Sequence, residues 1–238
     1  MARTDIDFAD RILVDTGEII AWNKPAGLLT TGRNLDDPDC AQHLAIEYID
    51  HNMIWALHQL DRDTSGVVLF ARQKHLVKKW QDRWNTPAIE KYYALLVHGH
   101  LPESPTTIDA PLTKLGRTGY TEVAVDDDGK RAVTDCWELD RSDHYSLVVA
   151  RLRTGRTHQI RAHLQHIGCP LIGEERYNSI PCGYHDRHAL HALAIRTDRS
   201  PPLDLMEAPV AEDLVYPAEK LDLDLDRLRD WTEQLDLR

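Results

Sequence analysis

Short apolar runs separated by polar turns recur along most of this chain. Apolar runs of about four to eight residues, bounded by turn residues, are typical of strands. The turn DTGE at 15–18 lies between two such runs and predicts a hairpin, and the run VVLFA at 67–71 predicts a buried strand. We expect further strands at 91–97 and 145–152, short strands within 106–135, and a short apolar element at 190–195 in an otherwise irregular stretch.

Apolar positions three or four residues apart predict helices elsewhere. These helices cover 40–52, 74–85, the segment after Gly155 that carries Ile160, Leu164 and Ile167, and a leucine stripe near the C-terminus. Strands outnumber helices and follow one another like hairpins, which predicts an α+β fold with a mostly antiparallel sheet. We expect a single domain over 1–238, with a core at about 12–214 and an acidic helix at 215–238 packed on it.

Composition and charge narrow the class of protein. No apolar stretch approaches the roughly 20 residues that span a bilayer, and the N-terminus lacks the pattern of a signal peptide. Four cysteines without a C-x-x-C pair suggest neither a zinc site nor a disulfide framework, so we expect a cytoplasmic protein. The net charge of −11 argues superficially against a polyanionic partner.

The distribution of charge weakens that objection. Residues 201–238 hold 11 acids and 4 bases, and therefore −7 of the total, which leaves only −4 for residues 1–200. Within those, 72–91 and 151–161 are basic stretches. Local patches decide whether phosphates can be bound, so nucleic acid is neither required nor excluded. Three bases of the first stretch, Lys78, Lys79 and Arg83, form either a solvated helix face or an RNA contact.

The polar turn 58–66, HQLDRDTSG, stands directly before the buried strand and is the first candidate for a site. A rigid strand can hold the side chains of such a turn in fixed geometry while they stay accessible. Asp61 is the leading residue because Leu60 and the apolar strand suggest partial desolvation. The alternative is that its carboxylate merely caps the turn.

Two residues far along the chain could complete a site with Asp61. Tyr93 lies on the strand that follows the basic helix, and Arg161 lies on the helix after the Gly155 turn. A buried carboxylate beside a guanidinium stays ionised and can serve as nucleophile or base, while an aromatic ring can stack on a planar base. The combination suggests an enzyme that acts on a flipped base in a polynucleotide. Three histidines on the 159–167 helix and its start lack an acidic co-ligand, so we expect no metal.

Several motifs together resemble the RluA branch of the RluA/RsuA-type pseudouridine synthases, over roughly 12–214. NKPAGLL at 23–29, HQLDRDTSG at 58–66 and K-x-YAL at 91–95 are similar to the branch's first signature, catalytic-Asp motif and Tyr motif. TGRTHQIRxHL at 154–164 with IGxP at 167–170 resembles its Arg-helix motif, and LHA at 190–192 and AP at 208–209 resemble later positions. Their joint order is highly specific.

The resemblance implies an α+β catalytic domain with a long, bent, mostly antiparallel sheet, and isomerisation of uridine to pseudouridine in tRNA or rRNA without metal or other cofactor. Asp61 would be the essential carboxylate, as nucleophile or as base; Tyr93 would stack on the uracil and Arg161 would pair with Asp61. Substrate contacts are expected from a further set: Gln59, Arg62, Thr64, Lys91, Arg156 and His158.

The chain departs from the branch at Gln59, where Arg is usual and is implied to fill the gap left by the flipped nucleotide. Gln supplies hydrogen bonds but no charge. No S4-type RNA-binding domain is expected before Ile12, and a monomer is expected. The competing hypothesis is a synthase-like RNA-binding or RNA-remodelling protein whose role does not depend on catalysis.

Overall fold

The computed structural model describes residues 6–34, 37–50, 53–116, 122–178, 180 and 183–236. Cys182 and the ends of two predicted helices, 51–52 and 237–238, lie outside these residues. The chain folds as two compact units, each described separately below. The first contains 1–89 and 192–209, and the second contains 90–191 and 210–238. No helix among the described residues is long and apolar enough to cross a bilayer.

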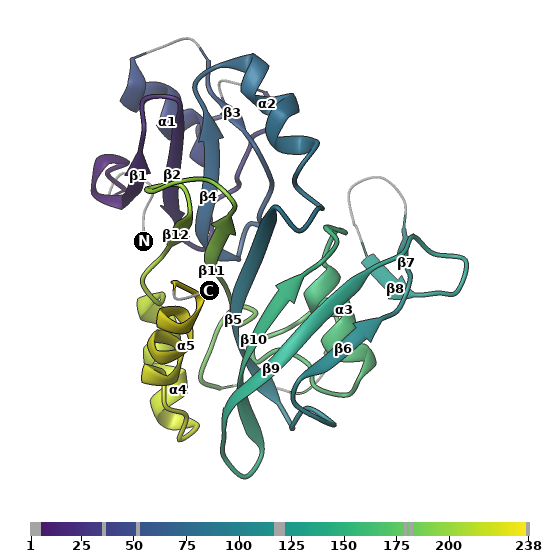
Figure 1. Ribbon diagram of the computed structural model, residues 1–238. Helices are drawn as coiled ribbons and strands as arrows, with labels where there is room; N and C mark the ends of the chain where they lie inside the picture. Colours follow the sequence, from purple (N-terminus) through teal and green to yellow (C-terminus); the bar gives the residue numbers. More distant parts are fainter. Residues whose placement is uncertain are drawn as a thin grey trace. The chain divides into compact units, whose positions relative to one another are not determined.

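The first unit is built on a sheet with the strand order β1–β2–β4–β11 (Figure 1). Its elements are β1 (Ile12–Asp15), β2 (Ile19–Lys24), β3 (Trp55–Ala56), β4 (Ser65–Ala71), β11 (Leu190–Thr197) and β12 (Leu205–Glu207), with the 3₁₀ helix η2 (Ala9–Arg11), α1 (Ala41–Ile49) and α2 (Lys74–Gln81). The predicted hairpin at 15–18 is confirmed, because β1 and β2 pair antiparallel around that turn. The predicted buried strand is confirmed as β4, in which every residue is buried.

The α2 helix packs on this sheet through one apolar face. Leu76 and Trp80 are buried in a core with Ile19, Leu69 and Ile195. The predicted helix at 74–85 therefore exists, but it ends at Gln81, four residues early. Trp84 still packs against the same core from the turns that follow.

Gly66 allows β4 and β11 to approach closely. Its φ is +107°, a region that side chains disfavour, and an added Cβ would lie 2.1 Å from the carbonyl oxygen of Ala192. We predict that Gly66→Ala lowers the free energy of unfolding by about 2–4 kcal/mol, because backbone strain and a steric clash add. Urea denaturation measures this loss.

Gly17→Ala is the matched control. Gly17 has a φ of +79° but nothing within 4 Å of an added Cβ. It therefore isolates the backbone strain, which costs about 1–2 kcal/mol. If Gly66→Ala and Gly17→Ala lowered the free energy of unfolding equally, the close approach of β4 and β11 would not contribute to the effect.

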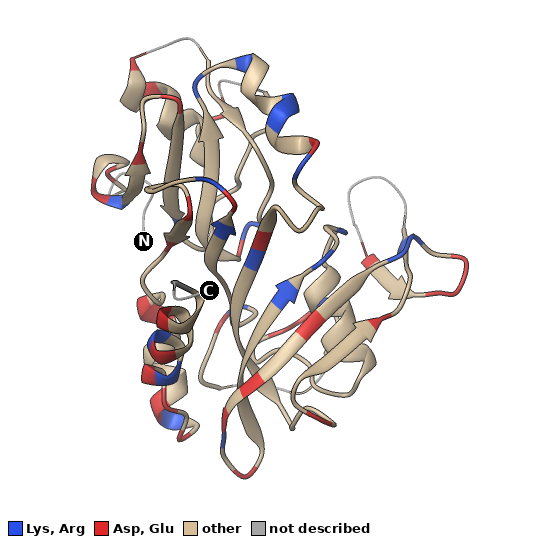
Figure 2. Cartoon of the chain, in the orientation of Figure 1, with Lys and Arg blue, Asp and Glu red and all other residues tan. Residues whose placement is uncertain are grey.

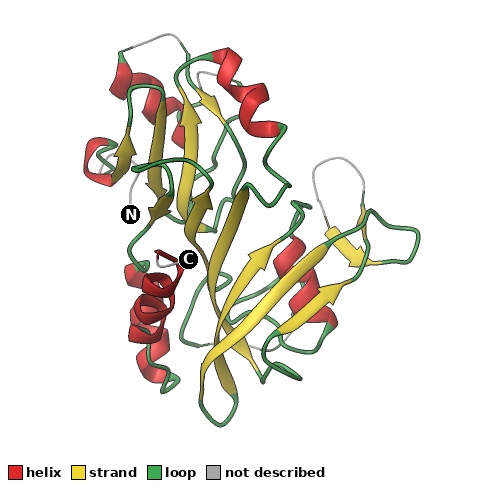
Figure 3. Ribbon diagram, viewed as in Figure 1, coloured by secondary structure: helices red, strands yellow, loops and turns green. Residues whose placement is uncertain are grey.

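The second unit is built on a sheet with the order β5–β10–β9–β6 (Figure 3). The described elements are β5 (Ile89–His98), β6 (Thr106–Asp109), β9 (Val133–Arg141) and β10 (Tyr145–Leu152), a separate pair β7 (Leu112–Leu115) and β8 (Glu122–Val125), and the helices α3 (Gln159–His166), α4 (Glu212–Lys220) and α5 (Asp226–Asp236). The ladders of this unit are antiparallel, as predicted. The α+β class is therefore confirmed.

The two faces of this sheet have different partners. The register aligns Arg151 with Tyr92, and Trp231 of α5 contacts Tyr92 at 5.0 Å between ring centroids. The next pair, Ala150 and Tyr93, belongs to the opposite face, because side chains alternate along a strand. Cys136 of β9 pairs with Ala150 and shares its face with Thr134, to which α3 is hydrogen-bonded. Tyr93 and α3 thus lie on one face, and Tyr92 and α5 on the other.

The prediction of one acidic helix over 215–238 is wrong in its boundaries. Two helices, α4 and α5, occupy this region, and Leu221 and Leu225 fall between them. Asp222 adopts a left-handed conformation with φ of 56°, and the N–H of Leu223 bonds back to the carbonyl of Ala218, which ends α4. Leucines at helical spacing on both sides of this turn give the sequence the pattern of one helix.

Candidate active site

The loop that carries Asp61 is fixed by hydrogen bonds within the first unit. Thr30 holds the backbone of Leu60, the residue before Asp61. Its Oγ1 accepts from the N–H of Leu60 at 3.0 Å and donates to the carbonyl of Leu60 at 3.1 Å. The N–H of Thr64 closes a turn on the carbonyl of Asp61 at 3.1 Å. Asp61 itself is half-buried. The carboxylate is therefore presented on a rigid loop, which is the arrangement that a positioned catalytic group needs.

Lys24 connects the Asp61 loop to the loop that follows β2 through hydrogen bonds of its ammonium group. Its side chain is fully buried, and its Nζ donates to the carbonyls of Pro25 at 2.9 Å, Leu28 at 2.7 Å and Arg62 at 2.9 Å. A buried ammonium group is tolerated only when its donors are satisfied, and here three carbonyls from two loops do so. The role of Lys24 was not predicted from the sequence; a lysine directly between an apolar strand and a proline was the available signal.

We predict that Lys24→Met lowers the free energy of unfolding by about 2–3 kcal/mol, because three carbonyls, of which that of Leu28 is buried, lose their shared donor. Urea denaturation measures the change. Lys79→Met is the matched control, since Lys79 is exposed on α2 of the same unit. A Lys24 variant as stable as the control would show that the two loops do not depend on this ammonium group.

Three other predicted residues, and His58, lie in the loop that carries Asp61. Gln59 accepts a hydrogen bond from Thr31 Oγ1 at 3.1 Å, and Arg62 Nη1 donates to the carbonyl of Gly27 at 3.3 Å; both are exposed. Thr64 is buried. His58 has a structural role, because its Nε2 accepts from the N–H of Leu69 at 3.1 Å. The contacts of Gln59, Arg62 and Thr64 with a substrate stay predictions.

Tyr93 and Lys91 belong to β5 in the second unit and, two residues apart, to the same face of the strand. Both are buried. Burial lowers the pKa of Lys91 to about 8, because the low dielectric disfavours the charged ammonium. That face is also the one on which α3 packs, so the structure brings Tyr93 and the helix of Arg161 to one side of the sheet.

Arg161 forms a buried ion pair with Glu174, a residue that the sequence reasoning missed. Arg161 Nε donates to Glu174 Oε2 at 2.6 Å and Nη2 donates to Oε1 at 2.8 Å. The guanidinium also lies 5.2 Å from the ring centroid of Tyr177. The pair with Glu174 engages Nε and Nη2 and so fixes the plane of the guanidinium. The predicted pairing of Arg161 with Asp61 joins residues of the two units and stays a prediction.

Glu174 is stabilised as a carboxylate. Burial alone would raise its pKa, but the hydrogen bonds and charge of Arg161, with the N–H groups of Arg176 and Tyr177, hold the pKa below its ordinary value. Tyr177 links this pair to the start of α3, because its hydroxyl lies 2.7 Å from Nδ1 of His158. His158 thus contacts a neighbour of the ion pair.

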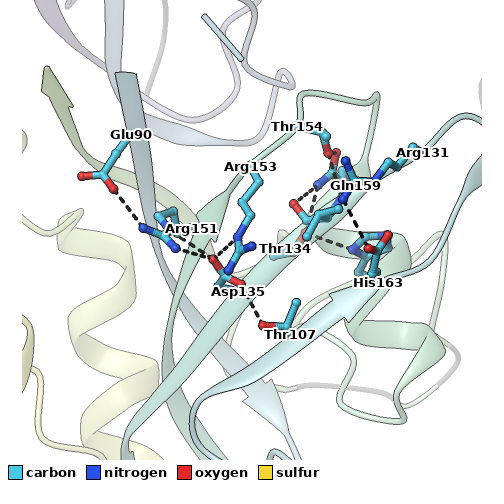
Figure 4. Close-up of polar contacts among 12 residues, drawn as sticks. Glu90, Thr107, Arg131, Thr134, Asp135, Arg151, Arg153, Thr154, Gln159 and His163 are labelled. Carbon is cyan, nitrogen blue, oxygen red and sulfur yellow. Dashed lines mark hydrogen bonds and ion pairs between the residues drawn. The ribbon is translucent and has the colours of Figure 1, made fainter. Parts of the chain in front are cut away.

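Gln159 anchors the start of α3 to β9 (Figure 4). Its Nε2 donates to Val133 O at 3.0 Å and to Thr134 Oγ1 at 2.9 Å, while its Oε1 accepts from Thr154 Oγ1 at 2.8 Å and from the N–H of Arg156 at 3.0 Å. Every donor and acceptor of the buried amide is therefore engaged. This anchoring fixes the helix that carries Arg161, and it was not predicted from the sequence.

His163 has a structural role on the same helix. Its Nε2 lies 2.9 Å from the carbonyl of Ala110, and its Nδ1 lies 2.9 Å from Thr134 Oγ1. Burial lowers its pKa, so the ring is neutral, with Nε2 as the donor to the carbonyl and Nδ1 as the acceptor.

The basic stretch 151–161 is partly neutralised by carboxylates (Figure 4). Asp135 accepts from Arg151 Nη2 at 2.7 Å and from Arg153 Nε at 2.7 Å, and Arg151 Nη1 also donates to Glu90 at 2.9 Å. Arg156 is exposed and its Nε donates to the carbonyl of Arg131 at 3.0 Å. The four arginines of this stretch are therefore not four equivalent phosphate ligands; of them, Arg153 and Arg156 are exposed.

In this α+β fold, the first unit presents a carboxylate on a rigid loop, and the second presents a buried tyrosine and a buried arginine on one face of its sheet. The sequence pattern of one family, described as RNA pseudouridylate synthase, matches residues 18–166. The chain therefore belongs to the RNA pseudouridylate synthase family.

Individual relatives agree with this assignment. The chain is 33% identical over 221 residues to an uncharacterized RNA pseudouridine synthase of Zymomonas mobilis, covering 90% of this chain and 97% of the relative. It is 31% identical over 220 residues to the ribosomal large subunit pseudouridine synthase C of Yersinia pestis, covering 87% and 67%. The chain spans only about half the length of other curated relatives, among them a Bacillus subtilis protein of which it covers 55%.

A solved structure shows the same fold. The human RNA pseudouridylate synthase domain containing 4 superposes with a TM-score of 0.75 and 21% identity, over 92% of this chain and 95% of that one. The fold class predicted from the motifs is thereby confirmed.

Proposed function

We propose that this chain isomerises specific uridines to pseudouridine in structured RNA. The observation that supports this most is the family match over 18–166, which includes the rigid loop of Asp61, β5 with Tyr93, and α3 with Arg161. Names of relatives such as the Yersinia pestis protein make large-subunit ribosomal RNA the first target to test, with tRNA as the second.

The proposed reaction assigns one role to each predicted residue. The bond between uracil N1 and the ribose anomeric carbon breaks, the uracil turns, and its C5 forms the new bond to that carbon. The proton at C5 leaves and N1 gains a proton, so the atoms balance without an oxidant, a reductant or a cofactor. Asp61 acts as nucleophile at the anomeric carbon or as base at the neighbouring ribose carbon, Tyr93 stacks on the uracil, and Arg161 orients the carboxylate.

Loss of the C5 proton provides the test. The protein is incubated with total RNA labelled with tritium at uracil C5, taken from cells that lack the gene, and tritium released to water is counted. We expect release from a small number of sites, and mapping of pseudouridine in RNA from cells with and without the gene identifies them. No release from ribosomal or transfer RNA would contradict the proposed function.

A further inference from the structure

The outer face of α2 carries a concentration of positive charge in an acidic protein. Lys74, Lys78 and Lys79 are exposed, while Leu76 and Trp80 on the opposite side are buried in the core. Figure 2 shows basic residues gathered on this helix, whereas acidic residues outnumber basic ones on α4 and α5. The whole chain carries a net charge of −11, so this cluster opposes the overall balance. We call these three residues the α2 lysine face.

The arrangement of these lysines favours the helix only in part: Lys78 and Lys79 lie in the last turn, where cations complement the helix dipole, but Lys74 lies in the first turn. The first turn begins with Lys74 and His75, contains no acidic residue, and has no side-chain cap. Cations in the first turn oppose the helix dipole, and Lys74 and Lys78 are like charges four residues apart. Of these three lysines, only Lys78 has a carboxylate within ion-pair distance among the described residues, namely that of the exposed Asp82 at 3.4 Å. The stability of the helix therefore does not account for Lys74, and a local choice of this kind is expected where a surface serves a function.

The α2 lysine face belongs to the same packed unit as the Asp61 loop. Trp84, in the turns that follow α2, stacks on His58 with ring centroids 4.5 Å apart and planes inclined by 23°. His58 precedes Asp61 by three residues and is hydrogen-bonded to β4. A ligand held by α2 is therefore held by the unit that presents the carboxylate.

We propose that the α2 lysine face binds backbone phosphates of the RNA that flanks the target uridine; this inference rests on the proposed function. Lysine is a point charge suited to phosphate, and Lys74 and Lys78 lie about 6 Å apart along the helix axis. The exposed residues of α2 are all polar or charged: Lys74, His75, Lys78, Lys79 and Gln81. Protein interfaces have an apolar centre and few lysines, so this face suits RNA better than a protein partner. Arg83 lies outside the face because it pairs with Asp198.

The salt dependence of RNA binding tests this surface. A triple variant, Lys74→Gln/Lys78→Gln/Lys79→Gln, is compared with Lys220→Gln/Arg227→Gln/Arg229→Gln, which removes the same charge from exposed positions on α4 and α5. Binding of a short fluorescein-labelled RNA hairpin is followed by anisotropy at several potassium chloride concentrations, and kcat and KM are measured by tritium release.

We expect the α2 variant to raise Kd and KM about tenfold or more at low salt and to leave kcat unchanged. The slope of log Kd against log salt should fall by about 2, since each lost phosphate contact removes about 0.7. Its Tm should stay within a few degrees of that of the wild type, because the loss of favourable charges in the last turn of α2 offsets the loss of an unfavourable one in the first turn. A merely structural role would lower the Tm and leave the salt dependence of binding unchanged. The control variant should keep the wild-type slope.

An unchanged Kd and an unchanged salt slope in the α2 variant would overturn the proposal. This is also the result expected if the α2 lysine face binds an acidic protein and not RNA. Binding does not require catalysis. A wild type that binds RNA with the expected slope but releases no tritium would contradict the proposed function and leave the docking surface supported.

Discussion

Asp61→Asn will abolish release of tritium from RNA labelled at uracil C5, reducing kcat by about 10⁴-fold or more. Asn has nearly the same shape but can neither attack the anomeric carbon as an anion nor accept a proton. The loop is held by Thr30 and Lys24 through backbone groups, so the substitution leaves its geometry intact. RNA binding measured by anisotropy should therefore persist while turnover disappears.

Asp82→Asn provides the matched control, because Asp82 is an exposed carboxylate of the same unit. It should keep the wild-type kcat, and both variants should melt within a few degrees of the wild type. Full release by Asp61→Asn would reject the assignment of the essential carboxylate. A wild-type protein that binds RNA without releasing tritium would instead favour a role that depends on binding alone.

Apolar periodicity predicted most of the elements because burial imposes it directly. The hairpin of β1 and β2, the buried run of β4, and the strands β5 and β10 all follow from short apolar runs between turns. The basic helix α2 follows from Leu76 and Trp80, whose spacing matches one buried face. Strand β9 was largely missed, since most of it, residues 135–141, is rich in polar residues, which pair with Arg151, Ser146 and other side chains.

The contacts that hold the residues of the candidate site in place could not be predicted from the local pattern of apolar and charged residues. Lys24 bonds to a carbonyl 38 positions away, and Arg161 pairs with Glu174 across the end of α3 and the loop that follows it. Nothing in the spacing of charges distinguishes Glu174, which is buried, from Glu175, which is exposed. Partners of this kind are brought together only by the folded chain. The motifs identify residues such as Asp61 and Arg161, but they do not show which other side chains hold those residues in place.

Glu174→Gln will lower the free energy of unfolding by about 3–5 kcal/mol at neutral pH, because it leaves the buried guanidinium of Arg161 without its anionic partner. The pKa of Glu174 is held below its ordinary value of 4.5. Its charged form therefore stabilises the folded state above that value, and this contribution is lost as the pH falls through the folded-state pKa. The difference between wild type and variant should be largest near neutrality and should shrink in acid.

Urea denaturation at several pH values measures this difference, with Glu175→Gln as the matched control because that neighbouring carboxylate is exposed. The double variant Arg161→Met/Glu174→Leu should recover much of the stability, since replacing both members of a buried ion pair by apolar groups removes the unpaired charge. It should nevertheless stay inactive in tritium release if Arg161 orients the carboxylate. If Glu174→Gln and Glu175→Gln lowered the free energy of unfolding equally, or if the difference did not depend on pH, the ion pair would not stabilise the position of Arg161.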